Sequence, residues 1–143
     1  MRQLFLAAGL ILATVGAARA EEIPDLTGRW TFTAEAVGFT FDKYGVSEET
    51  AFRTFESTVD FDRQDGRRVA GHEVDHKVSS GPDPIGIERV VAVIGHDNKS
   101  VYMVDENGFR DCVILDADTM SCVYRHTLEH RSDISVGYWK RQK

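Results

Sequence analysis

The chain has 143 residues, with 23 acidic against 17 basic side chains and a net charge of −6 at pH 7. This acidic balance argues against nucleic acid and anionic membrane surfaces as partners, because both repel a negatively charged protein. The length suits one domain with a single hydrophobic core. The sequence contains no internal repeat and no low-complexity segment.

The first 20 residues have the three parts of a secretory signal peptide. A basic start at Arg2 precedes an apolar stretch over residues 4–17, and Ala18-Arg19-Ala20 fits the small-x-small rule for cleavage. The apolar stretch is shorter than the roughly 20 residues that span a bilayer, so we expect cleavage rather than a membrane anchor. The predicted mature chain, residues 21–143, is one periplasmic or secreted domain without a membrane span. Loss of two arginines moves its net charge from −6 to −8.

Beyond the signal, short stretches rich in Val, Ile, Phe and Tyr alternate with Gly, Asp, Asn and Pro turns, and no stretch keeps a helical period for long. We therefore predict an all-β chain with strands at about 28–35, 51–61, 67–78, 85–95, 100–105, 109–116, 119–128 and 134–141. Most connections have the length of a hairpin turn, such as Asp65-Gly66. Consecutive hairpins predict an eight-stranded antiparallel up-and-down (meander) β-barrel, with an interior for packed side chains or one small ligand. A half-open sheet or a sandwich is the alternative.

Two connections are longer than a hairpin turn. Residues 36–50 carry Phe39, Phe41 and Tyr44, and a long loop with three aromatic rings is typical of a functional lid. Alternatively, these rings cover the open end of the barrel as an extension of its core. The second stretch, residues 79–84, opens at the same end in an up-and-down topology.

Cys112 and Cys122 are the only cysteines, and an exported protein meets an oxidising compartment. A three-residue turn at Asp116-Ala117-Asp118 would bring Leu115 opposite Thr119 and Cys112 opposite Cys122. In a non-hydrogen-bonded antiparallel pair the two Cα atoms lie about 4.5 Å apart, a distance that a disulfide tolerates. We therefore predict a disulfide. Two free thiols, or a metal or redox pair, are the alternatives, although the Cys-x-x-Cys spacing is absent.

No enzyme motif is visible: Gly-x-Ser-x-Gly, His-Glu-x-x-His and dinucleotide fingerprints are absent. His72 and His76 would lie about 13 Å apart on a strand, too far to bind one ion, so we predict no metal site and no cofactor. On the seventh strand, Tyr124 and His126 share a face with Met120. This mixture suits a ligand pocket with polar anchors, or a core with satisfied polar groups.

The first predicted strand opens with Gly28-Arg29-Trp30. A tryptophan here, with a glycine two residues before it, suits a barrel whose narrow end is plugged by one large ring. The arrangement resembles the calycin superfamily, the lipocalin, avidin and fatty-acid-binding-protein barrels, in which an arginine near the end of the last strand packs on the indole. The resemblance implies that Arg141 packs on Trp30 as a structural clasp, with Gly28 beside it. A frayed basic tail is the alternative.

These observations predict a non-enzymatic barrel that binds a small hydrophobic or amphipathic molecule in its lumen. Trp30 and Phe32 would floor the cavity, and the first long loop would gate it, as the corresponding loop does in lipocalins. The predicted ligand-binding residues are Trp30, Phe32, Phe39, Phe41, Tyr44, Tyr124 and His126. A protein-binding or inhibitor module that acts through its loops is the second hypothesis. A lumen of several hundred cubic ångströms would favour the first and a packed interior with an exposed apolar rim the second. An isomerase or cyclase barrel, which needs a clustered, buried titratable pair, is third.

Overall fold

The computed structural model describes residues 22–41, 45, 47–78 and 88–143. This part of the chain forms eight strands: β1 (Gly28–Phe41), β2 (Ser47–Asp65), β3 (Arg68–Val78), β4 (Arg89–Ile94), β5 (Ser100–Val104), β6 (Gly108–Asp116), β7 (Thr119–Leu128) and β8 (Arg131–Arg141). It contains no helix that could cross a membrane. The predicted signal peptide, Tyr44 and the stretch 79–84 lie outside the described residues.

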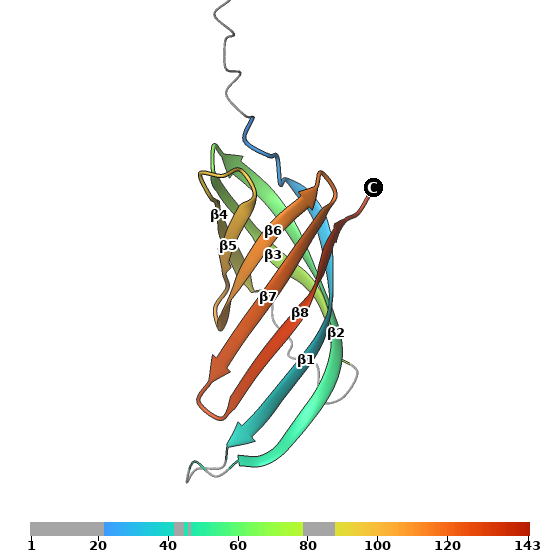
Figure 1. Ribbon diagram of the computed structural model, residues 1–143, viewed down its shortest axis with the longest axis vertical. Coiled ribbons are helices and arrows are strands. Elements are labelled where there is room, and N and C mark those ends of the chain that lie inside the picture. The colour runs from blue at the N-terminus through green and yellow to red at the C-terminus, as the bar shows by residue number, and fades with distance from the viewer. Residues whose placement is uncertain (1–21, 42–44, 46, 79–87) are drawn as a thin grey trace, which may run out of the picture.

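Each strand pairs antiparallel with the next one, and β8 returns to pair with β1, which closes the sheet into a barrel (Figure 1). The ladder between β1 and β8 runs without interruption from Trp30 opposite Arg141 to Thr40 opposite Arg131. The predicted all-β meander barrel is therefore confirmed, and the half-open sheet and the sandwich are wrong.

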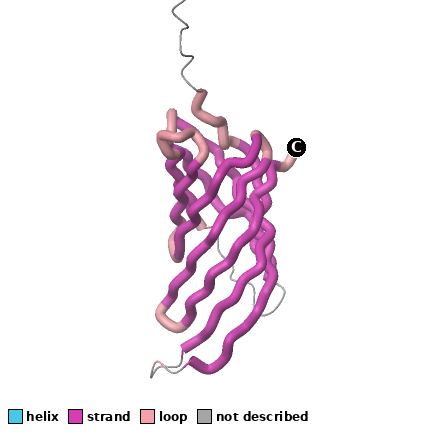
Figure 2. Tube along the Cα trace, in the orientation of Figure 1, coloured by secondary structure: helices cyan, strands magenta, loops and turns pink. Residues whose placement is uncertain are grey.

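The strands differ greatly in length. β4 and β5 have 6 and 5 residues, whereas β1 and β2 have 14 and 19. As a result β1, β2, β7 and β8 continue past the short strands and form a longer wall at one end of the barrel (Figures 1 and 2). We call this the far end, and the end at which residues 22–27 and the C-terminus lie the terminal end.

The long loop predicted at residues 36–50 is wrong. β1 continues to Phe41 and β2 begins at Ser47, and the two strands stay paired as far as Phe39 opposite Thr50, beyond which the register shifts. This segment looked like a loop because it contains Gly38 and several polar residues. Pairing of β1 with both β2 and β8 satisfies its backbone groups and keeps it extended.

The terminal half of the barrel is filled by apolar side chains from alternate positions of the strands. Trp30, Phe32 and Trp139 are fully buried, and Trp139 stacks on Phe32 with 5.1 Å between ring centroids and 14° between planes. The core also contains Leu26, Val59, Phe61, Val69, Val90, Ile94, Val101, Met103 and Met120. This half of the interior is a packed core.

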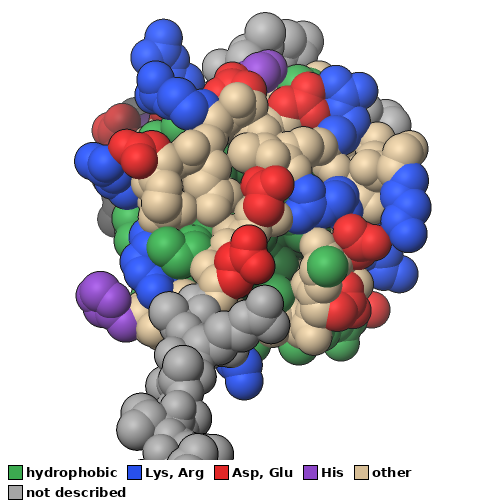
Figure 3. Space-filling model, turned by 90° about the horizontal axis from the view of Figure 1, so that it is seen from above, with side chains coloured by type: hydrophobic (Ala, Val, Ile, Leu, Met, Phe, Trp, Pro, Cys, Tyr) green, Lys and Arg blue, Asp and Glu red, His purple; other side chains and the backbone are tan. Residues whose placement is uncertain are grey.

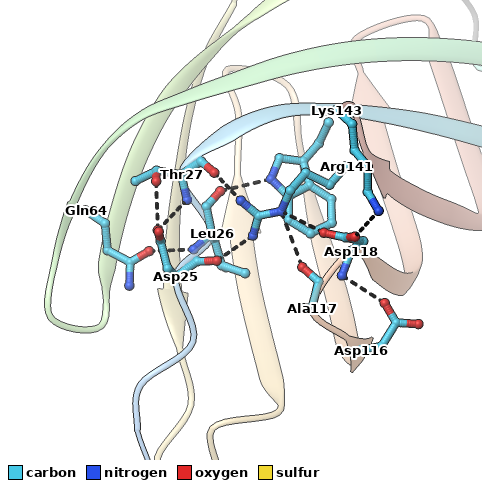
Figure 4. Close-up of polar contacts among 10 residues, drawn as sticks. Asp25, Leu26, Thr27, Gln64, Asp116, Ala117, Asp118, Arg141 and Lys143 are labelled. Carbon is cyan, nitrogen blue, oxygen red and sulfur yellow. Dashed lines mark hydrogen bonds and ion pairs between the residues drawn. The ribbon is translucent and has the colours of Figure 1, made fainter.

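Arg141, at the end of β8, closes the terminal end of the barrel by contacting the segment that precedes β1 (Figure 4). Its guanidinium carbon lies 4.5 Å from the centre of the Trp30 ring. The guanidinium donates hydrogen bonds to the backbone oxygens of Thr27, Asp25 (2.5 Å) and Ala117 (3.3 Å). The predicted packing of Arg141 on Trp30 is confirmed, and the terminal basic segment is ordered against the barrel.

The segment before β1 seals this end. Leu26 is buried in the core, and its carbonyl accepts a hydrogen bond of 2.9 Å from the indole nitrogen of Trp30. Gly28 follows with a φ of +114°, a backbone conformation that residues other than glycine rarely adopt. Seen from this end, the surface shows acidic and basic side chains with few apolar ones between them (Figure 3).

The predicted disulfide is present between Cys112 and Cys122, whose Cα atoms lie 4.1 Å apart. The two cysteines are directly opposed in the β6–β7 ladder, as predicted. The turn differs by one residue, because Asp116 pairs with Thr119 and the register shifts at Leu115. Asp116 accepts a hydrogen bond of 2.8 Å from the backbone nitrogen of Asp118, which stabilises the tighter turn.

Candidate binding site

The far half of the barrel encloses a cavity of about 140 Å³. Side chains reach it from six strands and from the segments that precede β4 and β6. One half of its wall comes from β7, β8, β1 and β2, and the other from β3 to β6. The apolar lining residues are Ala36, Phe55, Tyr124 and Leu128. The remaining lining residues are polar or charged, so the two halves of the lumen differ in character.

A basic cluster lies on the first half of the wall, around the carboxylate of Asp133. Arg53 approaches one oxygen at 3.3 Å, and Arg131 and the Nδ1 atom of His126 (3.4 Å) approach the other. The Asp133 side chain is 8% exposed and fits here because β1 carries Gly38 opposite it. A Cβ atom at residue 38 would lie 1.8 Å from an Asp133 oxygen, so the cluster requires glycine there.

A buried ion pair joins Arg110 on β6 to Asp105, whose side chains are 3% and 0% exposed. Asp105 also accepts hydrogen bonds from the backbone nitrogens of Asn107 (3.0 Å) and Gly108 (2.6 Å), which hold it in the β5–β6 turn. The Arg110 guanidinium carbon lies 4.2 Å from the centre of the Tyr124 ring. Arg110 is thus fixed by a carboxylate and by an aromatic face.

Two further carboxylates, Glu73 and Glu88, lie on the same half of the wall as Arg110. The hydroxyl of Ser57 donates a hydrogen bond of 2.9 Å to Glu73, and the side-chain amide of Asn107 donates one of 2.8 Å to Glu88. Burial raises the pKa of Glu88, and the negative charges of Asp105 and Glu73 raise it further. This is the kind of clustered, buried set of titratable groups that the isomerase or cyclase hypothesis requires.

Tyr124 lies between the two halves of the wall. Its ring stacks on His126 with 5.8 Å between centroids and 17° between planes. A Cβ atom at Gly108 would lie 2.6 Å from a Tyr124 ring carbon, so this glycine provides the space for the phenol. Burial raises the pKa of the Tyr124 hydroxyl far above its usual range, so the phenol stays neutral and can both donate and accept a hydrogen bond.

Two buried polar atoms at the cavity have no hydrogen-bond partner among the described residues: the hydroxyl oxygen of Ser135 and the Nε atom of Arg110. Ser135 is 4% exposed and lies on β8 directly opposite Tyr124. Buried polar groups are nearly always paired, so each unpaired one needs a physical explanation. A molecule bound in the cavity would explain both unpaired atoms by providing their hydrogen-bond partners.

The structure distributes the predicted site residues over three places. Tyr124 and His126 line the cavity. Trp30 lies at the opposite end of the barrel, and Phe32 lies in the packed core, where it contacts the lining residue Phe55 at 5.5 Å between ring centroids. The floor of the cavity is therefore Phe55 together with Arg110 rather than Trp30 and Phe32.

Phe39 and Phe41 are strand residues that pack edge to face on each other, with 4.8 Å between ring centroids. Alternation along β1 places Phe39 on the opposite face of the sheet from the inward-facing Gly38. Neither ring is among the residues that line the cavity. We therefore assign no gate to these two residues.

The charged residues of the cavity were missed in the sequence. They and the buried hydroxyl are Arg53, Glu73, Glu88, Arg110, Arg131, Asp133 and Ser135, and Asp105 is buried behind the lining as the partner of Arg110. Asp105 precedes Asn107-Gly108 in the sequence, which is typical of a solvated turn, but its side chain is buried in the structure. In the structure His72 approaches Asp62 at 3.4 Å on the outer face, and Glu73 faces inward. The sequence feature that could have predicted the inward orientation of Glu73 is Val69, which is buried on the same strand. Residues separated from it by an even number of positions lie on the same face.

The described residues contain no group of three or more His, Cys, Asp or Glu side chains that could hold a metal ion. Comparison of the sequence with models of protein families gave no match, and a search of curated proteins gave none either. The function must therefore be argued from the geometry and charge of the cavity.

Proposed function

We propose that this protein is an exported, non-enzymatic barrel that binds a small amphipathic molecule in the cavity of its far half. The observation that carries the proposal is a charged, incompletely paired interior next to a fully packed one. On β2, Phe52 is 83% exposed while the Arg53 side chain is 14% exposed. Burying arginine and exposing phenylalanine costs stability, and such conflicts are expected where a site needs them.

The cavity is smaller than the several hundred cubic ångströms predicted from the sequence for a ligand-binding lumen, and this size restricts the ligand. A volume of about 140 Å³ is close to that of an engineered protein cavity of about 150 Å³ that holds benzene. We therefore expect a ligand of about six to ten non-hydrogen atoms. A long fatty acyl chain is too large for it. Phe55 and Leu128 would contact the apolar part of the ligand, and the charged side chains would contact its polar part.

Two further proposals concern class and location. We infer that the barrel is calycin-like, supported by the Gly28-x-Trp30 opening of β1 and by Arg141 packed on the indole. We also infer that the protein is periplasmic or secreted, supported by the disulfide and the signal-like N-terminus.

The binding proposal is tested by filling the cavity. Ala36 lines it, and Thr33 is exposed on the opposite face of the same strand. Calorimetric titration with phenol, benzamide, benzylamine and benzoate should detect one-to-one binding to the mature protein. Ala36→Leu should abolish that binding, whereas the control Thr33→Leu should keep it. Unchanged binding to Ala36→Leu, or no binding of any small amphipathic compound, would refute the proposal.

An apolar patch on the outer face supports protein docking as a second candidate. Val91, Val93, Tyr102, Val104 and Phe109 are each between 47% and 56% exposed on β4, β5 and the start of β6. Exposed patches of this kind mark interaction sites. If the barrel acts through this patch, Val93→Lys should release a protein partner that copurifies from the native host, and Ala36→Leu should not.

A further inference from the structure

We propose that the ligand of the cavity is a small zwitterion, a molecule that carries one ammonium and one carboxylate group, as a free amino acid does. The proposal rests on the function proposed above and deepens it, because it names the charges of the ligand. Glu88 would bind the ammonium group. Arg53, Arg131 and the hydroxyl of Ser135 would bind the carboxylate.

The first argument is that charge is divided between the two halves of the cavity wall. On the β3–β6 side, the described lining includes the carboxylates of Glu73 and Glu88, and the charge of Arg110 is paired with Asp105. On the β7–β2 side, the two guanidinium groups of the basic cluster outnumber its one carboxylate. The strand order of a closed barrel sets these two halves against each other. A ligand with separated opposite charges matches this arrangement, and a neutral ligand leaves it unused.

On the acidic side, the carboxylate of Glu88 has no ion pair with any cation in the described part of the chain. Arg110 is committed to Asp105 by their buried ion pair. The hydrogen-bond donor that the structure gives Glu88 is the neutral amide of Asn107, at 2.8 Å. An ammonium group would add the missing positive charge and use the remaining acceptor capacity of the carboxylate.

The basic side provides donors beyond those that Asp133 uses. One carboxylate is shared by Arg53, Arg131 and His126, so the cluster keeps a surplus of positive charge even when His126 is neutral. Ser135, two residues from Asp133 on β8 and on the same face, presents a buried hydroxyl without a partner among the described residues. Arginine and hydroxyl donors together are the usual ligands of a carboxylate.

The lining between the two charged sides fits the rest of such a molecule. Phe55 and Leu128 are apolar, and the neutral Tyr124 ring, which lies 4.2 Å from the guanidinium carbon of Arg110, also lines the cavity. A volume of about 140 Å³ accommodates an amino acid with a short aliphatic side chain better than one with an indole.

The test compares three forms of one probe against the mature protein. Calorimetric titration would use alanine, valine, leucine, proline and 4-aminobutanoate, each followed by its methyl ester, which lacks the carboxylate, and its N-acetyl derivative, which lacks the ammonium. At least one free amino acid should bind one to one, and about tenfold more tightly than either derivative. Equal affinity of the ester or of the acetylated form would overturn the proposal, because one charge of the ligand would then be unused.

Two variants assign the charges. Glu88→Gln should weaken binding of the free amino acid about tenfold and leave that of the N-acetyl form unchanged. Arg131→Gln should weaken binding of the free amino acid and leave that of the methyl ester unchanged. The controls are Glu35→Gln and Arg125→Gln on the outer face, which should change neither. A Glu88→Gln protein that binds the free amino acid as well as the unmodified protein does would overturn the assignment.

The outcome separates this proposal from the one on which it rests. If phenol or benzamide binds and is lost in Ala36→Leu, but no amino acid binds, the zwitterion is wrong and the cavity still binds small amphipathic molecules. If neither group of compounds binds, both proposals are wrong.

Discussion

Replacing Arg141 with alanine tests how much the contacts between the last strand and the start of the first strand stabilise the fold. The change removes a cation–π contact worth about 1 kcal/mol and hydrogen bonds to backbone carbonyls worth about 0.5–1 kcal/mol each after allowance for solvent. The Arg141 side chain is 21% exposed, so most of this contribution is retained in water. We therefore expect the free energy of unfolding to fall by about 2–3 kcal/mol. For a domain of this length, that lowers the melting temperature by roughly 8–12 °C.

Urea unfolding followed by tryptophan fluorescence measures this loss, since Trp30 lies under the guanidinium. Arg125→Ala is the matched control, because Arg125 pairs with Asp111 on the outer face where both side chains are about half exposed. Such a surface pair contributes less than about 1 kcal/mol. Arg141→Lys keeps the charge but not the forked donors, so an intermediate loss is expected. Equal losses of unfolding free energy in Arg141→Ala and Arg125→Ala would refute the argument that Arg141 stabilises the fold by connecting β8 to the start of β1.

Three more predictions follow from single contacts. Replacing Cys112 and Cys122 with serine should lower the unfolding free energy by about 2–3 kcal/mol, measured in urea, because the disulfide closes a short loop in the unfolded chain; an unchanged midpoint would contradict this. Asp97 accepts hydrogen bonds from Ser100 and Lys99, which lower its pKa to about 2. Its stabilisation should thus be complete above about pH 4 and be lost as the pH falls toward 2, and an NMR titration midpoint near 4 would be inconsistent with these bonds. Removing Arg110 alone should cost about 3–5 kcal/mol, because it leaves an unpaired buried carboxylate. Arg110→Met with Asp105→Asn should recover most of this loss, since the neutral amide oxygen still accepts the backbone hydrogen bonds of Asn107 and Gly108; equal stability of the single and double variants in urea would disprove that cause.

The packed half of the barrel could be predicted from the sequence, and particular residues show why. Cys112 and Cys122 lie opposite each other because a hairpin turn between them leaves few registers. Trp30 and Arg141 pair because the first and last strands of a closed barrel are neighbours. On β1, the run from Trp30 to Ala34 alternates apolar with polar residues, so burial selects one face of this strand.

The cavity could not be predicted in the same way, because its strands do not alternate cleanly. The β2–β3 ladder has two register irregularities, one that leaves Val74 of β3 unpaired and one that leaves Asp62 of β2 unpaired, and each changes which face the following residues of its own strand share. Along Phe52-Arg53, the hydrophobic pattern favours burial of the phenylalanine, yet the arginine faces the lumen. A prediction of burial from hydrophobicity alone assigns polar residues to the solvent, because it does not consider a ligand that could pair with them. The positions at which the pattern fails are therefore themselves an indication of the site. Arg53, Glu73 and Ser135 are polar residues that face the lumen on different strands, and all three line the same cavity.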